Sequence, residues 1–381
     1  MTRVKVKPEI YFWMISESQI APQDIEIKFD KLDQWISGEL DPTFKQLQSF
    51  TNYLKIPFGY AFLEEPPQED IIESEFRTLK NVMPVISKNL KDVISDMSYK
   101  QGWLSEHRQK NGWEPLFENI LLETDSKDII KIAQQIKDDL NLSKDWFENN
   151  KNPKEAYNYL RQVLETKGFI VMQSGVVGNY KRRVLNISEF RGFALYDDFA
   201  PLIFVNSKDS DKGKIFTLIH EAVHLFYKND DVIVEDSVLK NANETTINRI
   251  TAEILMPKEI ILEQWEYAGD LNSQVNNINK ISNRIFVSSI SLSIRLLQLG
   301  LINNEVVNEI QSQTSLNLQK KSKQNKGNFW HDYFAKYSQS FIQEVIAATE
   351  GGTITHSDAF QLLDVKAKNY EIVKERAIQY V

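Results

Sequence analysis

Hydrophobic residues recur every three or four positions over most of this chain, a spacing typical of amphipathic α-helices. Residues 8–65 follow it in short stretches separated by turn residues, and residues 70–111 follow it over longer ones. The first region therefore predicts a bundle of short helices, and the second predicts one or two long helices. Further helices are expected after the acidic segment 125–128 and from Asn152–Pro153, because both begin with residues that cap helix N-termini.

The pattern changes after Gly168, where short hydrophobic runs are separated by Gly, Asp and Pro residues. These runs predict three strands, at 169–172, 193–196 and 202–205. Helical spacing then returns and predicts four more helices, at about 212–227, 243–266, 275–285 and 288–299. The chain is therefore expected to have an α+β fold that is mainly helical and contains one small sheet.

Shifts in composition divide the chain into five segments. The stretch 319–326 is polar, basic and free of hydrophobic residues, so we assign it, with residues 306–318 before it, to a linker. Helical spacing resumes after this linker. The predicted segments are an N-terminal helical region (1–68), a helical connector (69–124), a mixed region (125–305), the linker (306–326) and a C-terminal helical region (327–381).

Composition excludes several classes of function. The 381 residues include no cysteine, so disulfides, thiolate nucleophiles and cysteine metal ligands are ruled out. The net charge of -8 disfavours binding of a phosphate backbone outside a local basic patch. No hydrophobic run approaches the roughly 18 to 20 residues that span a bilayer, and the first residues lack a signal-peptide cleavage site. We therefore expect a cytoplasmic protein without a membrane segment.

Residues 216–227 carry the pattern His-Glu-x-x-His on a strongly hydrophobic predicted helix. Because His220 and His224 are four residues apart, one helical face presents both imidazoles to the same metal ion. Glu221 lies beside the first histidine, where it can act as a general base on a water molecule at the metal. The alternative is a pair of hydrogen-bonded histidines without a ligand. It is less favourable, because unpaired polar side chains are costly to bury.

A metal site of this kind needs a third protein ligand. Glu244 lies on the next predicted helix, one helical turn before Asn248, and its spacing favours it over the alternatives. Glu253 is a competitor on a different face of the same helix. Glu235 and Asp236, in the loop between the two helices, are further candidates. Spacing alone therefore favours Glu244 and leaves the other candidates open.

Four segments extend the pattern beyond the two histidines: Pro201–Asn206, Phe216–Leu225, Glu244–Pro257 and Phe286–Ile302. Together they resemble the motifs of the ImmA/IrrE family of metallo-endopeptidases. The resemblance implies a zincin-like peptidase core in residues 125–305, with Glu221 as the general base and Glu244 as the third ligand. It also implies a zinc ion as the cofactor, with manganese or another divalent ion as the alternative. Departures such as Ala222–Val223, where the family usually has Leu-Gly, remove no catalytic group.

The same resemblance implies what the protein acts on. Characterised members of the family cut helix-turn-helix repressors, and longer members occur with mobile elements and toxin–antitoxin loci. We therefore expect a zinc-dependent endopeptidase that cleaves a helix-turn-helix repressor or an antitoxin-like protein, and an extended substrate that pairs with strand 202–206 by edge addition. The alternatives are a helix-turn-helix transcriptional regulator with a structural metal site, and a toxin component that a small partner neutralises.

Residues 8–65 resemble the Cro/C1-type helix-turn-helix domain that often precedes this peptidase, with Trp35–Gly38 followed by Pro42–Thr43. Acidic residues outnumber basic ones in this region, and the segment in the place of the recognition helix, Asp30–Trp35, is not basic. Domains that bind DNA usually neutralise several phosphates with Lys and Arg side chains. DNA binding is therefore disfavoured, and a role in protein docking or in structure is expected instead.

Further residues carry weaker signals. The cluster Lys181–Arg183 predicts a solvated hairpin tip. Ser288 is expected to cap the next helix and Arg295 to have a structural role on it. Tyr227 and Arg191 lie near the predicted metal site in the sequence, as candidates to stabilise an oxyanion, but the sequence places neither of them.

Overall fold

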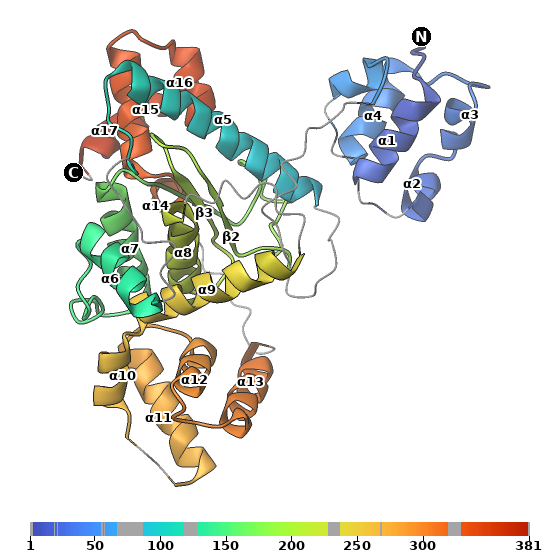
Figure 1. Cartoon of the computed structure of the whole chain (residues 1–381). Helices are drawn as coiled ribbons and strands as arrows, with labels where there is room; N and C mark the ends of the chain where they lie inside the picture. Colours follow the sequence, from blue (N-terminus) through green and yellow to red (C-terminus); the bar gives the residue numbers. More distant parts are fainter. Residues whose placement is uncertain are drawn as a thin grey trace. The chain divides into compact units, whose positions relative to one another are not determined.

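The structure is a computed structural model (Figure 1). It describes residues 3–18, 20, 22–54, 56, 58–66, 87–117, 128–227, 237–266, 269–318 and 329–379, and only the backbone at 237–243, 315–318 and 378–379. The chain divides into two compact units. The described residues of the N-terminal unit are 3–66 and 87–92, and those of the larger unit run from 93 to 379. Each unit is described by itself.

The N-terminal unit is a bundle of short helices, as the hydrophobic pattern predicts. Its core centres on Phe50, whose ring lies edge-on to those of Phe29 and Trp35 at centroid distances of 5.2 and 6.0 Å. Trp35 ends the segment expected in the place of a recognition helix. Its side chain is only 4% exposed, so it packs in the core. The elements are α1 (Pro8–Ser18), α2 (Pro22–Lys28), α3 (Leu32–Ile36), α4 (Phe44–Leu54) and the 3-10 helix η1 (Phe58–Phe62).

The larger unit contains the predicted three-stranded sheet, made of β1 (Ile170–Ser174), β2 (Gly192–Leu195) and β3 (Leu202–Asn206). The order is β1-β3-β2, with β1 parallel and β2 antiparallel to β3. Every residue of β1 and β3 is buried, which explains their continuous hydrophobic runs. The expectation that a substrate pairs with β3 by edge addition is wrong, because β1 and β2 occupy both edges of β3.

Helices cover the sheet of the larger unit, so the fold is α+β and mainly helical, as predicted. Asp128 and Asn152 accept hydrogen bonds from the first backbone N–H groups of α6 and α7, which confirms both predicted caps. The predicted helix at 243–266 is two helices, because Pro257 ends the first of them. The helices are α5 (Lys88–Lys110), which begins in the N-terminal unit, α6 (Ile129–Asp139), α7 (Pro153–Thr166), α8 (Asp211–Phe226), α9 (Ser237–Leu255), α10 (Lys258–Gln264), α11 (Leu271–Arg284), α12 (Ser289–Gln298), α13 (Asn304–Leu318), α14 (Phe329–Lys336), α15 (Gln339–Glu350), α16 (His356–Leu362) and α17 (Ala367–Gln379).

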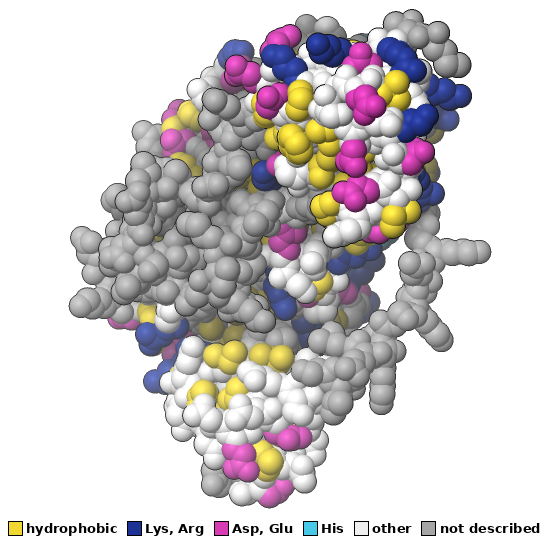
Figure 2. Space-filling model, turned by 90° about the vertical axis from the view of Figure 1, so that its right-hand side faces the viewer, with side chains coloured by type: hydrophobic (Ala, Val, Ile, Leu, Met, Phe, Trp, Pro, Cys, Tyr) yellow, Lys and Arg dark blue, Asp and Glu magenta, His cyan; other side chains and the backbone are white. Residues whose placement is uncertain are grey.

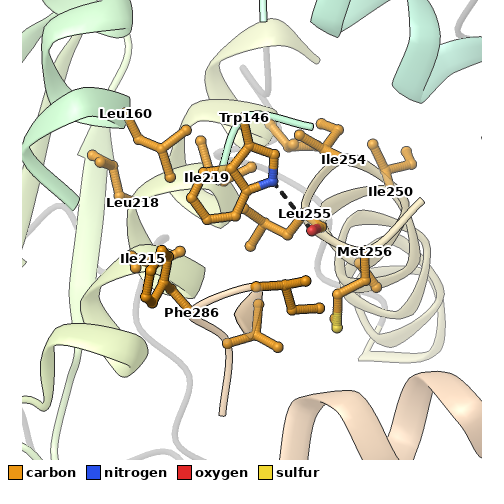
Figure 3. Close-up of a cluster of buried hydrophobic side chains, with 14 of the residues drawn as sticks. Trp146, Leu160, Ile215, Leu218, Ile219, Ile250, Ile254, Leu255, Met256 and Phe286 are labelled. Atoms are coloured by element: carbon orange, nitrogen blue, oxygen red, sulfur yellow. Dashed lines mark hydrogen bonds between the residues drawn. The ribbon is translucent and has the colours of Figure 1, made fainter. Parts of the chain in front are cut away.

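A continuous hydrophobic core joins α8 to α9 and to the helices that follow (Figure 3). Leu218 and Ile219 of α8 face the same cluster as Ile254 of α9, and all three are almost fully buried. The indole Nε1 of Trp146 donates a hydrogen bond of 3.3 Å to the carbonyl oxygen of Leu255, at the end of α9. This packing fixes the two helices against each other, which matters because they carry the histidines and Glu244.

The predicted linker 306–326 begins with ordered structure. Its first residues belong to α13, whose Val306, Val307 and Ile310 are buried in the same hydrophobic core. Residues 319–328 lie outside the described part of the chain. Any linker among the remaining residues therefore starts only after Leu318.

The C-terminal helices, predicted as a separate region, belong to the same compact unit as the sheet. The guanidinium of Arg108 on α5 is almost fully buried and forms hydrogen bonds with Glu344 of α15. It also donates to the carbonyl oxygens of Gly168 and Phe199, at 2.9 and 2.7 Å, in the segments that lead into β1 and β3. Figure 1 shows α15, α16 and α17 gathered beside α5. These contacts attach the C-terminal helices to the segments that lead into the sheet.

One face of the molecule is mixed in charge where its residues are described. On the face drawn in Figure 2, acidic and basic side chains are interspersed and hydrophobic side chains lie between them. This face therefore shows no broad basic field of the kind that binds a nucleic acid duplex. Among the helices that the structure describes, none combines the length and the hydrophobicity that crossing a bilayer requires.

Candidate metal centre

The helix that carries the two histidines begins and ends where its sequence predicts. The hydroxyl of Ser210 accepts a hydrogen bond of 3.1 Å from the N–H of Gly213, and Asp211 occupies the positive N-terminal end of α8. Apolar side chains on the other faces are buried against β2, β3, α7 and α9. His220 and His224 therefore project together from the remaining face, one helical turn apart.

Helix α9 packs against α8 and brings a carboxylate to the two rings. The Nε2 atoms of His220 and His224 are 3.1 Å apart. The Glu244 carboxylate oxygens lie 3.6 Å from the Nε2 atom of His220 and 3.3 Å from that of His224. These three residues form the only His, Cys, Asp or Glu cluster with metal-ligand spacing in the described residues.

The spacing of these donor atoms fits a divalent ion. Three atoms that each lie about 2.1 Å from a tetrahedral ion are about 3.4 Å from one another. The observed separations of 3.1, 3.3 and 3.6 Å bracket that value. Two imidazoles and one carboxylate are also the donor set of catalytic zinc sites. The side chain of Glu244 is 40% exposed, so solvent reaches one side of the cluster.

The protonation state of His220 also suits a metal. The pKa of His220 is lowered to about 4, mainly by burial and also by the neighbouring His224, whereas Glu244 and a hydrogen bond with Asn248 act in the opposite direction. The ring is therefore neutral near pH 7, as a metal ligand must be. Among the described residues, its buried Nδ1 atom has no hydrogen-bond partner.

Glu221 lies where α8 meets the first residue of β2. A Cβ atom added to Gly192 would lie 3.4 Å from Cγ of Glu221, 2.5 Å from Cγ2 of Thr217 and 2.8 Å from the carbonyl oxygen of Phe204. Only glycine therefore lets the β2 backbone approach the general-base candidate this closely. The sequence motifs do not single out Gly192, although a glycine directly before a short hydrophobic strand signals a close backbone approach.

Glu253, the competing carboxylate on α9, forms other contacts. Glu253 is buried in an ion pair with Arg295, and its other oxygen accepts a hydrogen bond of 3.2 Å from the N–H of Lys258. These contacts give Arg295 the structural role expected for it. Glu235 and Asp236, the two loop carboxylates that spacing also allowed as a third ligand, lie outside the described residues.

The remaining candidates are placed as follows. Arg191, directly before Gly192, is 56% exposed and forms an ion pair of 3.1 Å with Asp209. Tyr227 is the C-cap residue of α8, and burial raises the pKa of its hydroxyl. Neither residue belongs to the cluster of three ligands. Ser288 caps α12 by accepting a hydrogen bond from the N–H of Ser291, as predicted.

One comparison with known proteins bears on this site. Residues 179–297 match the family model described as the IrrE N-terminal-like domain, a peptidase family. No curated protein and no solved structure was found to match the chain. The matched segment includes α8 and α9 with all four candidate residues, and it leaves out the N-terminal unit, whose resemblance to a helix-turn-helix domain stays a prediction. The motif, the cluster and the match agree, so residues 179–297 are similar to the IrrE N-terminal-like peptidase domain.

Proposed function

We propose that this protein is a zinc-dependent endopeptidase that cleaves a helix-turn-helix repressor or an antitoxin-like protein. The observation that carries the proposal is the convergence of three ligand atoms from α8 and α9, with the carboxylate of Glu221 on the same helix. The family match supports peptide-bond hydrolysis. The choice of zinc rests on the donor set, which also accepts manganese.

His220, His224 and Glu244 would hold the ion. When bound there, zinc supplies Lewis-acid polarisation of the scissile carbonyl and of a water molecule. Glu221 takes the proton of the attacking water on its carboxylate and passes it to the leaving amine. The neutral state of His220 near pH 7 keeps its Nε2 lone pair available.

An extended substrate would pair with β2 instead of β3, because β2 is an outer strand of the sheet. The carbonyl oxygen of Arg191 accepts a hydrogen bond of 2.7 Å from the N–H of Asn206. Because hydrogen-bonded and non-bonded pairs alternate in an antiparallel ladder, the backbone groups of Gly192 and Ala194 point to the opposite edge of β2. A peptide paired along this edge passes Gly192, beside Glu221, so its backbone reaches the general base.

The proposed repressor or antitoxin-like substrate follows from the family and not from a contact in the structure. Incubating the purified protein with the helix-turn-helix protein encoded by the neighbouring gene, followed by mass spectrometry of the fragments, tests substrate and reaction together.

A Glu221→Gln variant tests the mechanism. The amide cannot accept the proton of water, so we expect cleavage to fall by about 10²- to 10⁴-fold, while the zinc content stays at the wild-type level. Cleavage at the wild-type rate in a folded variant would refute the role of Glu221. The rival account, a regulator with a structural metal, predicts that Glu221 is dispensable.

A further inference from the structure

Two segments almost two hundred residues apart in the sequence meet at one surface of the larger unit. The side-chain amide of Asn179 donates a hydrogen bond of 2.9 Å to the carbonyl oxygen of Asp364, in the turn between α16 and α17. The ammonium of Lys336 donates a bond of 3.2 Å to the carbonyl oxygen of Gly178. The hairpin at 175–185 is thereby tied to the C-terminal helices. We call the exposed cations of these two segments the basic surface: Lys181, Arg182, Lys366 and Lys368.

The hairpin is a fixed element and not a loose loop. Val176 and Val184 form an antiparallel bridge. Backbone hydrogen bonds of 2.9 and 3.0 Å join Val177 to Arg183 and Leu185 to Gly175. The bonds from Asn179 and Lys336 hold its outer turn from the other side. The cations at its tip are therefore presented in one arrangement, which lowers the entropy cost of binding a partner.

The four cations of the basic surface are exposed to solvent. Within the described part of the chain, the side chains of its four cations form no ion pair or hydrogen bond, and Tyr180 beside them is 67% exposed. The nearby carboxylate, Asp364, is already engaged by Lys336 and by the Tyr337 hydroxyl. Burial would raise the pKa of Asp364, but Lys100 and Lys336 outweigh burial and lower it, so the carboxylate stays charged and paired.

The segment that contains Lys181 and Arg182 of the basic surface continues along the chain to Gly192, beside Glu221 of the candidate metal centre. Residues 175–191 run from the end of β1 to Gly192, the first residue of β2, beside Glu221. The two outer strands of this sheet are separated by two strand spacings, about 10 Å. The base of the hairpin, at the end of β1, and Gly192 therefore lie at the same end of the sheet. A polypeptide that runs along the β2 edge passes this end of the sheet, from which the hairpin with Lys181 and Arg182 projects.

We propose that the basic surface binds an acidic segment of the protein substrate, close in sequence to the bond that is cut. This assignment rests on the proposed peptidase function and adds the charge of the segment that is recognised. Nucleic acid is the less suitable partner, because the chain has a net charge of -8 and the basic surface has four cations. Binding of a duplex usually neutralises six to ten phosphates, by order of magnitude.

The test measures binding without turnover. Full-length Glu221→Gln protein is titrated into a fluorescein-labelled deca-glutamate peptide, and the fluorescence anisotropy is followed at 50 and 300 mM NaCl. The double substitutions K181E/R182E and K366E/K368E are made in the same background. The matched control, K280E/R284E, makes the same change of charge on two exposed residues of α11, away from the basic surface. Circular dichroism melting checks the fold of each variant.

We expect the peptide to bind more weakly by about tenfold in each basic-surface variant and within about twofold of the parent in the control. Binding should also weaken at the higher salt concentration. Equal binding by all variants would overturn the proposal, and so would tighter binding of a labelled single-stranded oligonucleotide than of the peptide at the same surface. Because the assay needs no hydrolysis, these outcomes are independent of whether the wild-type protein cleaves its substrate.

Discussion

At the scale of single residues, the candidate site depends on which glutamate of α9 faces the histidines. Glu244 and Glu253 are nine residues apart, so they lie on opposite sides of a helix that turns about 100° per residue. Glu244 meets the Nε2 atoms of His220 and His224, whereas Glu253 is buried against Arg295. Their spacing in the sequence already shows that Glu244 and Glu253 lie on different faces of one helix. Only the packing of α9 on α8 decides which of the two faces the histidines.

The ion pair of Glu253 gives a stability prediction. Replacing Arg295 by Met leaves a buried carboxylate without its partner, so we expect the free energy of unfolding to fall by about 3 kcal/mol. Urea denaturation followed by circular dichroism measures the change. The control, Lys280→Met on the exposed face of α11, should stay within about 0.5 kcal/mol of the wild type. An equally small effect of Arg295→Met would contradict a structural role for this pair.

At the scale of elements, the sequence predicts most helices and all three strands, but not how the strands pair. Each strand lies within two residues of its predicted position. The spacing of hydrophobic residues and the turn residues that bound a strand are local features, so the sequence alone shows them. The central place of β3 depends on long-range pairing with β1 and β2, which no local pattern encodes. For the same reason the sequence predicts His220 and Glu221 on one helix, yet it does not show that Gly192 lies beside Glu221.

The close approach of β2 to α8 is tested by Gly192→Ala. The added methyl group would lie 2.8 Å from the carbonyl oxygen of Phe204 and 2.5 Å from Cγ2 of Thr217, so β2 must shift away from Glu221. We expect peptidase activity to fall by about a hundredfold, because small displacements of a bound substrate have effects of that size. Stability should fall by about 1 to 3 kcal/mol.

Gly102→Ala is the matched control for this substitution. An added methyl group at Gly102, on α5, meets no atom within 4 Å. The change should leave activity unaltered and raise stability by about 0.5 to 1 kcal/mol. Wild-type activity in the Gly192→Ala variant would show that the β2 edge does not guide the substrate.

At the scale of the whole molecule, buried polar contacts attach the C-terminal helices to the peptidase core. The Lys100 side chain of α5 is fully buried and pairs with Asp96 and Asp364, and Lys336 and Tyr337 contact the same Asp364 carboxylate. No local pattern predicts this network, because its members come from α5, α14 and the turn after α16. The prediction of a separate C-terminal region, residues 327–381, rests on the polar stretch 319–326 that precedes it.

The network predicts a pH-dependent stability. Asp364 has a φ of 50°, a conformation that Asn also adopts readily, so Asp364→Asn removes the charge with little strain. At pH 7 the variant should be less stable by about 2 kcal/mol, because Lys100 and Lys336 lose their counter-charge.

The pKa of Asp364 is lower in the folded protein than in the unfolded chain. Its stabilisation is therefore fully present above the unfolded pKa, about 4, and is lost as the pH falls through the folded value. Urea denaturation at pH 7, 5 and 3 should show the difference between wild type and variant shrinking only at the lowest pH. A difference that stays constant over this range would exclude the carboxylate charge as its source.

We expect α8 and α9 together to form one divalent metal site. Metal analysis of purified, zinc-equilibrated protein tests it most directly, with His224→Ala, Glu244→Gln and Glu253→Gln variants that are shown to be folded. We expect about one zinc ion per chain in the wild type and in Glu253→Gln, and far less in the other two variants. Wild-type zinc content in Glu244→Gln would exclude Glu244 as a ligand, and no zinc in the wild-type protein would exclude the metal site.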